Sequence, residues 1–358
     1  MDLDAIVVPA ARKPENLDSV LALGQQLDAQ LVLLCSRRAE AHAVRARVAE
    51  VPGLRCAVVD LATRVDLGFP RFETSTFGEA MIGSHGDLSL KRNLGLVLGR
   101  MCGWRTMLFI DDDIRGLTPR LARRAVGALQ HDDQRAAGLL AIDYPDNSVV
   151  CHARRLGARD QGVFITGSAL AIDVNHTDAF FPEVYNEDWF FLAPYLYRRE
   201  VVQVGTVRQV PYDPFESPLR AAAEEFGDVV AEGLVAQLHV GAPLPPTAPD
   251  YWARFLEYRA AFIAEAAAGC RSLDDRTAER AEESLAVSEW TRARLSPEVL
   301  ADYVLAWQAD RLAWARHLAG IRPQRDLPAA LAELGLSDPA STSAGHPYRT
   351  PSSRHSTE

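Results

Sequence analysis

The segment "TMLFIDDDIRG" (106–116) runs from five mainly apolar residues straight into three consecutive aspartates, Asp111, Asp112 and Asp113. A short apolar run bounded by charged residues is typical of a buried strand that ends at the edge of a sheet. Three adjacent carboxylates repel one another unless a cation or hydrogen-bond donors neutralise them. The segment therefore predicts a buried strand that ends in an acidic cluster at the edge of a sheet, and it indicates that this cluster has a functional role.

On both sides of this segment the chain alternates strand-like and helix-like stretches. Strands are expected at 5–10, 30–36, 54–61, 106–110 and 136–144, and helices at 15–29, 39–50, 88–103 and 119–130. Because these strands are nearly continuous apolar runs, we expect both of their faces to be buried. The first part of the chain is therefore predicted to be an α/β domain, in which a mainly parallel sheet has helices on both faces.

Beyond residue 145 the pattern is less regular. A strand pair is expected at 162–174, an acidic turn that opens a helix at 186–198, and a further strand at 201–213. After the proline-rich stretch 241–250, apolar residues recur at helical spacing in 251–269, 276–295 and 297–320. We therefore expect the α/β domain to span 1–245, a helical region to span 246–336, and the small, polar tail 337–358 to be disordered.

Four tryptophans lie in the C-terminal helical stretches. They are Trp252, Trp290, Trp307 and Trp314. We expect them to be packing residues rather than a carbohydrate-binding strip. The helices that carry them could pack on the α/β domain or form a homodimer contact.

Composition excludes several classes of protein. The formal net charge of −10 argues against a nucleic-acid binder, because phosphate contacts require clustered Lys and Arg. The five cysteines are dispersed and form no CxxC pair, as expected of reduced thiols. No signal peptide is recognisable, and no apolar run approaches the ~20 residues of a membrane helix. The sequence predicts a cytoplasmic protein without a transmembrane segment.

The aspartates have two readings. Ligands of open α/β sheets bind beyond the carboxyl ends of the strands, and Mg²⁺ or Mn²⁺ held by one or two carboxylates often completes its shell with substrate phosphates. If the chain stays extended, Asp111 and Asp113 point the same way and Asp112 points the other. The alternative is a solvated acidic turn in which Asp113 caps the helix near Thr118.

Four motifs occur in a distinctive order along the chain. They are "AIVVPAARKPENL" (5–17), "LKRNLGLVLGRMCGW" (90–104), "FIDDDI" (109–114) and "FFPEVYNEDWFF" (180–191). Together they resemble GT-A glycosyltransferases of the family 2 type, over residues 1 to about 240. The third motif is similar to the DxD motif of that family and the fourth to its ED motif. The resemblance implies a Rossmann-like GT-A fold, with a nucleotide-binding half (1–116) and an acceptor half (117–245).

The resemblance also implies a metal site. Asp113 would contact Mn²⁺ or Mg²⁺ directly, and Asp111 would contact the metal through water or touch the ribose. The triple run leaves the alignment ambiguous by one residue, so the role of Asp112 stays open. His239 is a candidate for a further metal ligand, although a lone histidine in an apolar stretch is often a packed residue.

The ED motif implies the catalytic groups. Asp188 would be the base that deprotonates the acceptor hydroxyl, Glu187 would position acceptor hydroxyls, and Trp189 would stack against a sugar. Gly167 and Ser168 would line the donor sugar and the acceptor. The alternative is that Asn186 caps a helix whose first turn favours the two acids.

Further residues are candidates for contacts with a UDP- or GDP-linked donor. They are Pro9, Ala10, Ala11, Arg12, Asp60, Lys91, Arg92 and Asn93. Small residues at the end of the first strand would let the nucleoside lie against the backbone, and the cations would pair with phosphates. The alternative is that the 91–93 stretch is an exposed helix start and that Asp60 only caps a turn.

We therefore expect a metal-dependent glycosyltransferase, inverting through Asp188, that acts on a small-molecule or glycan acceptor. A sugar nucleotidyltransferase would need a Gly-rich loop after the first strand, and "PAARKPENL" (9–17) has no glycine. A haloacid-dehalogenase-type hydrolase would carry its nucleophile on the first strand rather than the fourth. A non-catalytic nucleotide-sugar sensor or scaffold is the remaining alternative, and the intact acids at 113 and 188 disfavour it.

Overall fold

The computed structural model describes residues 3–62, 66–77, 86–131, 133–142, 148–157, 165–242, 246–323 and 325–336. The expected tail at 337–358 lies outside them. The strands are β1 (Ala5–Ala10), β2 (Gln30–Cys35), β3 (Cys56–Asp60), β4 (Thr106–Ile110), β5 (Ile114–Arg115), β6 (Ala136–Ala141), β7 (Ala169–Asp173) and β8 (Val201–Gln209). They form one sheet in the order β3-β2-β1-β4-β7-β6-β8-β5.

Among these strands only β7 and β5 run antiparallel to their neighbours in the described sheet. The remaining pairs, β1 with β2 and β4, β2 with β3, and β6 with β8, are parallel. Alternate residues of one strand enter different cores, so that Val7 packs with α4 (Leu88–Cys102) on one face and Val8 with α1 (Asp18–Leu27) on the other. The predicted α/β class, with a mainly parallel sheet covered on both faces, is confirmed.

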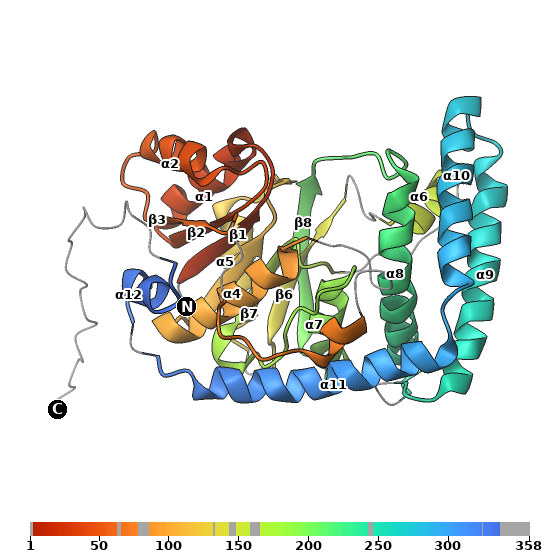
Figure 1. Cartoon of the computed structure of the whole chain (residues 1–358). Helices are drawn as coiled ribbons and strands as arrows, with labels where there is room; N and C mark the ends of the chain where they lie inside the picture. Colours follow the sequence, from red (N-terminus) through yellow and green to blue (C-terminus); the bar gives the residue numbers. More distant parts are fainter. Residues whose placement is uncertain are drawn as a thin grey trace.

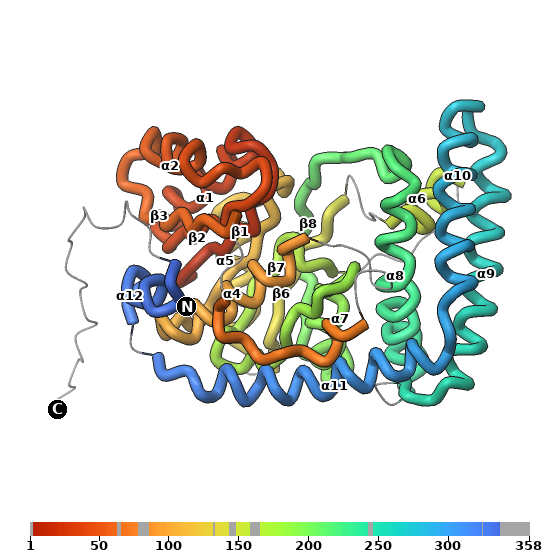
Figure 2. Tube along the Cα trace, viewed as in Figure 1, coloured from red at the N-terminus to blue at the C-terminus, as the bar shows by residue number. Residues whose placement is uncertain are grey.

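The helices surround this sheet as Figure 1 shows. They are α1 (Asp18–Leu27), α2 (Ala41–Ala49), α4 (Leu88–Cys102), α5 (Pro119–Ala128), α6 (Val149–Leu156), α7 (Glu187–Tyr197), α8 (Pro218–His239), α9 (Pro249–Cys270), α10 (Asp275–Arg292), α11 (Pro297–Gly320) and α12 (Leu327–Glu333). Short 3-10 turns are η1 (Pro14–Leu17), η2 (Glu73–Phe77) and η3 (Val174–His176). The tube in Figure 2 shows α11 passing along one side of the whole sheet, from the α8–α10 group toward α12.

Two differences from the sequence-based expectation lie between residues 145 and 240. The strand pair expected at 162–174 is the single strand β7, because Gly167 and Ser168 form a turn; residues 162–164 lie outside the described part. Helices α6 and α8 were not predicted. Both start with ordinary signals, since Ser148 accepts a hydrogen bond from the Cys151 N–H and Pro218 occupies the first turn of α8.

Helix α8 is joined to α9 by a buried ionic cluster. The fully buried Arg259 donates at 2.8 Å to each of Glu225, Asp228 and Glu232. Burial raises the pKa of Glu225 to about 7, and the guanidinium of Arg259 opposes that shift. A buried cluster of this kind is tolerated only while every charged group keeps its partners.

We expect Arg259→Met to lower the free energy of unfolding by about 3–5 kcal/mol, because the substitution leaves the buried carboxylates of Glu225 and Asp228 without their cation. Urea denaturation measures this change. The control is Arg280→Met, whose partner Asp213 is itself half exposed, with an expected effect of about 1 kcal/mol or less. A loss in Arg259→Met as small as that of the control would contradict a structural role for the cluster.

Three of the four C-terminal tryptophans are packing residues. Trp252, Trp307 and Trp314 are at most 1% exposed, which confirms the prediction for them. The prediction was wrong for Trp290, which is 60% exposed. The guanidinium carbon of Arg294 lies over its ring, 4.7 Å from the ring centre. No helix in the described ranges is both long and apolar enough to cross a bilayer.

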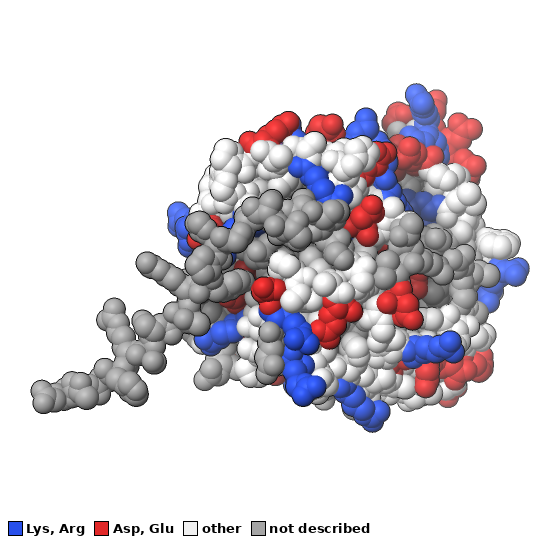
Figure 3. Space-filling view, turned by 60° about the vertical axis from the view of Figure 1, so that its left-hand side comes forward, with Lys and Arg blue, Asp and Glu red and all other residues white. Residues whose placement is uncertain are grey.

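Charged side chains of both signs are interspersed on the molecular face in Figure 3. Among the residues coloured there, Lys and Arg do not form a continuous strip.

Candidate active site

The chain turns at the three aspartates instead of continuing as a strand. The Asp111 N–H donates to the Ser168 carbonyl at 2.8 Å, and the Ile114 N–H donates to the Asp111 carbonyl at 3.1 Å. The expectation that Asp111 and Asp113 point the same way was therefore wrong. Asp111 pairs with Arg92, whereas Asp112 and Asp113 both pair with Arg12.

Asp112 anchors the loop that follows β1. Its Oδ2 accepts from the backbone N–H groups of Ala11 and Arg12, each at 2.8 Å, and its Oδ1 pairs with the Arg12 guanidinium. The residue is only 3% exposed. Because both of its oxygens accept from the loop itself, Asp112 holds this loop in place.

Asp113 has one carboxylate oxygen with a different environment. Its Oδ2 accepts from Gln209 at 3.1 Å and pairs with Arg12 at 2.8 Å. Its Oδ1 is buried and has no hydrogen-bond partner among the described residues. Burial raises the pKa of Asp113 to about 6, and Arg12 opposes the shift. A buried oxygen without a donor is a site that a cation can complete.

The alternative reading of a solvated acidic turn was wrong. Asp113 is 1% exposed, so it is not solvated. Thr118 itself caps α5, because its hydroxyl accepts from the Leu121 N–H at 3.3 Å. Asp112 and Asp113 are therefore part of the protein interior, at the end of β4.

Arg92 joins the two acidic motifs. Its Nη2 donates to both oxygens of Asp111, at 2.9 and 3.1 Å, and its Nη1 pairs with Glu187. Arg92 is buried on α4, so neither contact is a loose surface pair. Burial raises the pKa of Glu187 to about 8, and Arg92 opposes this shift. The DxD-like and ED-like motifs thus lie on opposite sides of a single guanidinium.

Asp188 is held by backbone groups. Its Oδ2 accepts from the Gly167 N–H at 2.5 Å, and its Oδ1 accepts from the Trp189 N–H at 2.9 Å. Burial raises its pKa. A Cβ at Gly167 would lie 2.7 Å from Arg92 Nη1 and 2.9 Å from Asp188 Cβ, so only glycine fits there. Ser168 follows, and its carbonyl holds Asp111.

Asn186 occupies the N-cap position of α7 but does not cap it through its side chain. Its Nδ2 donates instead to Asp228 Oδ1 at 2.8 Å. Glu187 and Asp188 do occupy the first turn of α7, where the helix dipole favours negative charge. The capping alternative is therefore correct for the position of the acids and wrong for the side chain of Asn186.

Two candidate nucleotide-binding residues are bound by the protein itself. The buried Lys91 donates to the Ala10 carbonyl at 2.9 Å and to Ser36 Oγ at 2.6 Å, and it pairs with Asp87 at 3.1 Å. Burial lowers its pKa, and Asp87 opposes the shift. The Asn93 amide both donates to and accepts from the backbone of Phe181. The alternative of an exposed helix start was wrong, since both residues are buried.

The other candidates lie at the ends of two strands. Pro9 and Ala10 are buried at the end of β1, followed by Ala11 and by Arg12, whose side chain is 43% exposed. Asp60 is exposed at the end of β3 and accepts from the Ala62 N–H at 2.9 Å, which is the turn-capping alternative. These residues therefore lie along the carboxyl edge of the sheet.

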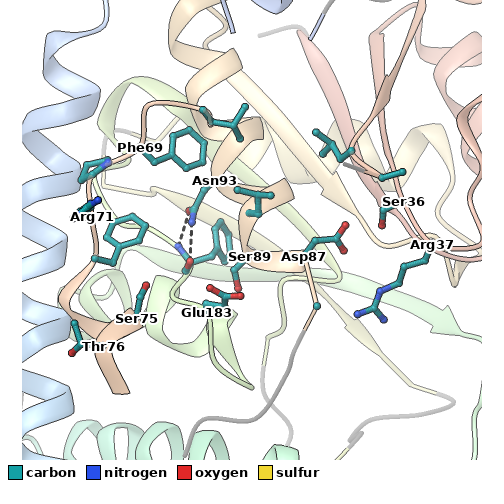
Figure 4. Close-up of a pocket in the computed structure, with 18 residues that line it drawn as sticks. Ser36, Arg37, Phe69, Arg71, Ser75, Thr76, Asp87, Ser89, Asn93 and Glu183 are labelled. Atoms are coloured by element: carbon teal, nitrogen blue, oxygen red, sulfur yellow. Dashed lines mark hydrogen bonds between the residues drawn. The ribbon is translucent and has the colours of Figure 1, made fainter. Parts of the chain in front are cut away.

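A cavity of about 1030 Å³ opens along this edge, beyond β2 and β3. Figure 4 shows Arg37 and Asp87 on one side of it and Phe69 and Arg71 on the other, with Asn93 and its two dashed hydrogen bonds between them. Ser36, another lining residue, is bonded through Lys91 to Ala10, next to the loop that Asp112 holds. Of the lining residues, Asn93 was a sequence-based candidate and the others were not, although the rule that suggested Asp60 applies equally to Ser36, which directly follows β2.

His239 does not join the aspartates. It is exposed and is the last residue of α8. Gly227, which packs against Tyr185 within the ED-like motif, lies twelve residues earlier on the same helix. At 1.5 Å per residue this separates the two by roughly 18 Å. His239 is therefore not part of the metal site proposed below.

No three His, Cys, Asp or Glu side chains gather into a metal cage within the described ranges. A Mg²⁺ or Mn²⁺ site that uses one or two carboxylates and substrate oxygens needs no such cage. The unpartnered Asp113 Oδ1 and the Asp111 side chain, which is 20% exposed, fit a site of that kind.

Comparisons with known proteins give structural likenesses only. No family model matches the chain, and no curated protein sequence matches it. The structure is similar to glucosyl-3-phosphoglycerate synthase from Mycobacterium tuberculosis in complex with Mn²⁺, UDP and phosphoglyceric acid, at 15% identity over 68% of this chain and 80% of that one, with a TM-score of 0.39. It is also similar to the mannosyltransferase PcManGT from Pyrobaculum calidifontis in complex with GDP-Man and Mn²⁺, at 16% identity over 86% of both chains, with a TM-score of 0.47.

Proposed function

We propose that this chain is a metal-dependent glycosyltransferase that moves a sugar from a nucleoside-diphosphate sugar to an acceptor hydroxyl. The observation that carries the proposal is the arrangement around Arg92, which brings the Asp111 end of the aspartate cluster next to the Glu187–Asp188 pair. The aspartate cluster could then bind a cation while the Glu187–Asp188 pair accepts a proton. The two acidic groups lie close to each other because both contact Arg92.

The aspartate cluster supplies the proposed metal site. Asp113 would bind Mn²⁺ or Mg²⁺ through Oδ1, and Asp111 would contact the ion through water. An ion held by these two residues would supply positive charge to offset the negative charge that builds on the leaving nucleoside diphosphate. Arg12, paired with Asp113 and partly exposed, would contact the same phosphates. The two similar proteins above are complexes with Mn²⁺ and a UDP or GDP compound, which supports this choice of cofactor.

The donor nucleoside would occupy the cavity beyond β2 and β3. Its lining combines the rings of Phe69 and Phe72 with the charged groups of Arg37 and Asp87. Such a mixture of apolar surface and a few polar groups suits an aromatic base attached to a ribose. We therefore propose that residues 1–116 bind the nucleotide and that 117–245 form the acceptor half, with the helical region at 246–336 as its support.

The ED-like pair supplies the proposed base. Asp188 would accept the proton of the acceptor hydroxyl, and Glu187 would orient that hydroxyl from its contact with Arg92. The raised pKa of Asp188 makes its carboxylate a stronger base than an exposed aspartate. Direct attack assisted by this base would invert the anomeric centre. Trp189, next to the base, would contact a sugar ring.

Calorimetric titration of the protein with UDP and with GDP, with and without Mn²⁺, tests the binding step. We expect one nucleotide to bind, and Mn²⁺ to strengthen its binding by about tenfold or more. Release of the same nucleotide from its sugar conjugates, measured over a panel of donors and acceptors, then tests catalysis. Failure of both nucleotides to bind in Mn²⁺ would refute the proposal, whereas tight binding without turnover would favour the sensor alternative.

A further inference from the structure

Helix α7, which carries Glu187 and Asp188, starts from a left-handed residue. Asn186 has φ 62° and ψ 34°, a conformation that few residues other than glycine adopt. Its side chain makes no capping bond to α7 and donates instead to Asp228 on α8. The direction in which the helix leaves this residue is therefore fixed from outside α7.

Asp228, the residue of α8 that Asn186 contacts, is itself held by a residue of α9. Asp228 is 2% exposed, and its second oxygen accepts from Arg259 of α9 at 2.8 Å. Arg259 is fully buried and makes two further bonds of 2.8 Å to Glu225. A continuous series of side chains thus runs from α9 through α8 to the start of α7, and Figure 1 shows α8 between the other two helices.

The backbone contact between α8 and this turn is equally close. A Cβ at Gly227 would overlap the carbonyl oxygen and Cβ of Tyr185, the residue before Asn186. Side chain and backbone of α8 therefore hold the same turn. Because Asn186 directly precedes the two acids, a rotation about its φ or ψ would move both carboxylates relative to Arg92 and Gly167.

We propose that Asp228, held by Arg259, is a positioning residue for the Glu187–Asp188 pair and acts through Asn186. The proposal rests on the function proposed above for that pair. The proposal gives the C-terminal helical region (246–336) a part in the reaction. Helix α9 belongs to that region, and its Arg259 holds Asp228, which would orient the proposed base Asp188. Neither Asp228 nor Arg259 would touch substrate.

The first test is Asn186→Gly. Glycine adopts the left-handed conformation without strain, so the fold is retained while the bond to Asp228 is lost. We expect kcat to fall by about tenfold or more, because small misplacements of a catalytic group are costly, with donor affinity changed by less than about twofold. Asp28→Gly is the matched control: Asp28 is also left-handed, at φ 51°, but is exposed at the end of α1. Its kcat should equal that of the wild type.

The second test reverses the hydrogen bond. Asn186→Asp alone sets two carboxylates against each other. Combined with Asp228→Asn, it lets the new amide at 228 donate to the new carboxylate at 186 while the amide oxygen still accepts from Arg259. We expect the double variant to be about tenfold more active than Asn186→Asp, a rescue that two independent structural defects would not give. A double variant no more active than Asn186→Asp would overturn the proposal.

A third readout does not depend on activity. The Gly167 N–H donates to Asp188 Oδ2, so its hydrogen exchange reports whether that carboxylate is in place. We expect faster exchange at Gly167 in Asn186→Gly and unchanged exchange in Asp28→Gly. Wild-type exchange in Asn186→Gly would overturn the inference. Because this arm needs no substrate, it decides the inference even if no donor is turned over and the proposed function fails.

Discussion

Asp113→Asn is expected to abolish the gain in nucleotide affinity that Mn²⁺ provides. The substitution keeps the size of the side chain and its contact with Gln209, but it removes the charge that a divalent cation requires. Even partners that only support a metal ligand change metal affinity by about 10–100-fold, so loss of a direct ligand should cost at least that much. Titration of UDP and GDP into the variant, with and without Mn²⁺, measures the loss.

Two comparisons make this result specific. Asp112→Asn changes the neighbouring residue, whose carboxylate already accepts from Ala11 and Arg12, and it should lower thermal stability more than it lowers the effect of Mn²⁺. Asp302→Asn changes an exposed position of α11 and should change neither. If Mn²⁺ still strengthened nucleotide binding to Asp113→Asn but no longer did so in Asp112→Asn, the ligand assignment would have to move by one residue.

Much of the sheet could be predicted because strands β1, β2 and β4 are buried on both faces. Strands such as β1 and β4 are uninterrupted apolar runs, and their predicted bounds agree with the structure. Helix α8 could not be predicted in the same way, since it buries Glu224, Glu225 and Asp228. These acids interrupt the apolar pattern, and their burial depends on partners such as Arg259, which lies on another helix and which local spacing cannot identify.

The sequence indicated which charged residues come together at the site, but it did not indicate the contacts that each of them makes. In the sequence the three aspartates are equivalent. In the structure their roles are set by donors far away along the chain: Arg92 for Asp111, the 11–12 backbone for Asp112, and Gln209 for Asp113. Gln209 ends β8, so applying the strand-end rule to every strand would have suggested it.

The partners of Arg92 could not be predicted from the sequence either. The sequence indicated a cation beside the aspartates, and a phosphate was its expected partner. The structure gives both of its terminal nitrogens to carboxylates, one on each motif. The position of a residue along a helix can indicate that it lies near a site. Whether it then pairs with substrate or with protein depends on all the charges around it, and these come from distant parts of the sequence.

The effect expected of Asp188→Asn follows from this placement. Asparagine has the same shape, and its one amide oxygen can still accept the Gly167 N–H, so the turn at 167–168 and the nearby Asp111 should stay in place. The Trp189 N–H loses its bond to residue 188 but keeps the one to the Asn186 carbonyl. The amide cannot take a proton from an acceptor hydroxyl. We therefore expect donor affinity to change by less than about threefold while the rate of sugar transfer falls by about 10²-fold or more, the usual scale for loss of a general base.

Glu187→Gln separates the base from its neighbour. Glu187 contacts Arg92, which also holds Asp111, so this substitution should weaken both donor binding and turnover, each by less than the loss of turnover in Asp188→Asn. Nucleotide release in the presence of acceptor, together with calorimetric donor binding, distinguishes the two patterns. Full turnover in Asp188→Asn would exclude it as the base. Glu187, whose burial raises its pKa to about 8 and whose carboxylate lies beside the same guanidinium, would then be the first group to test in its place.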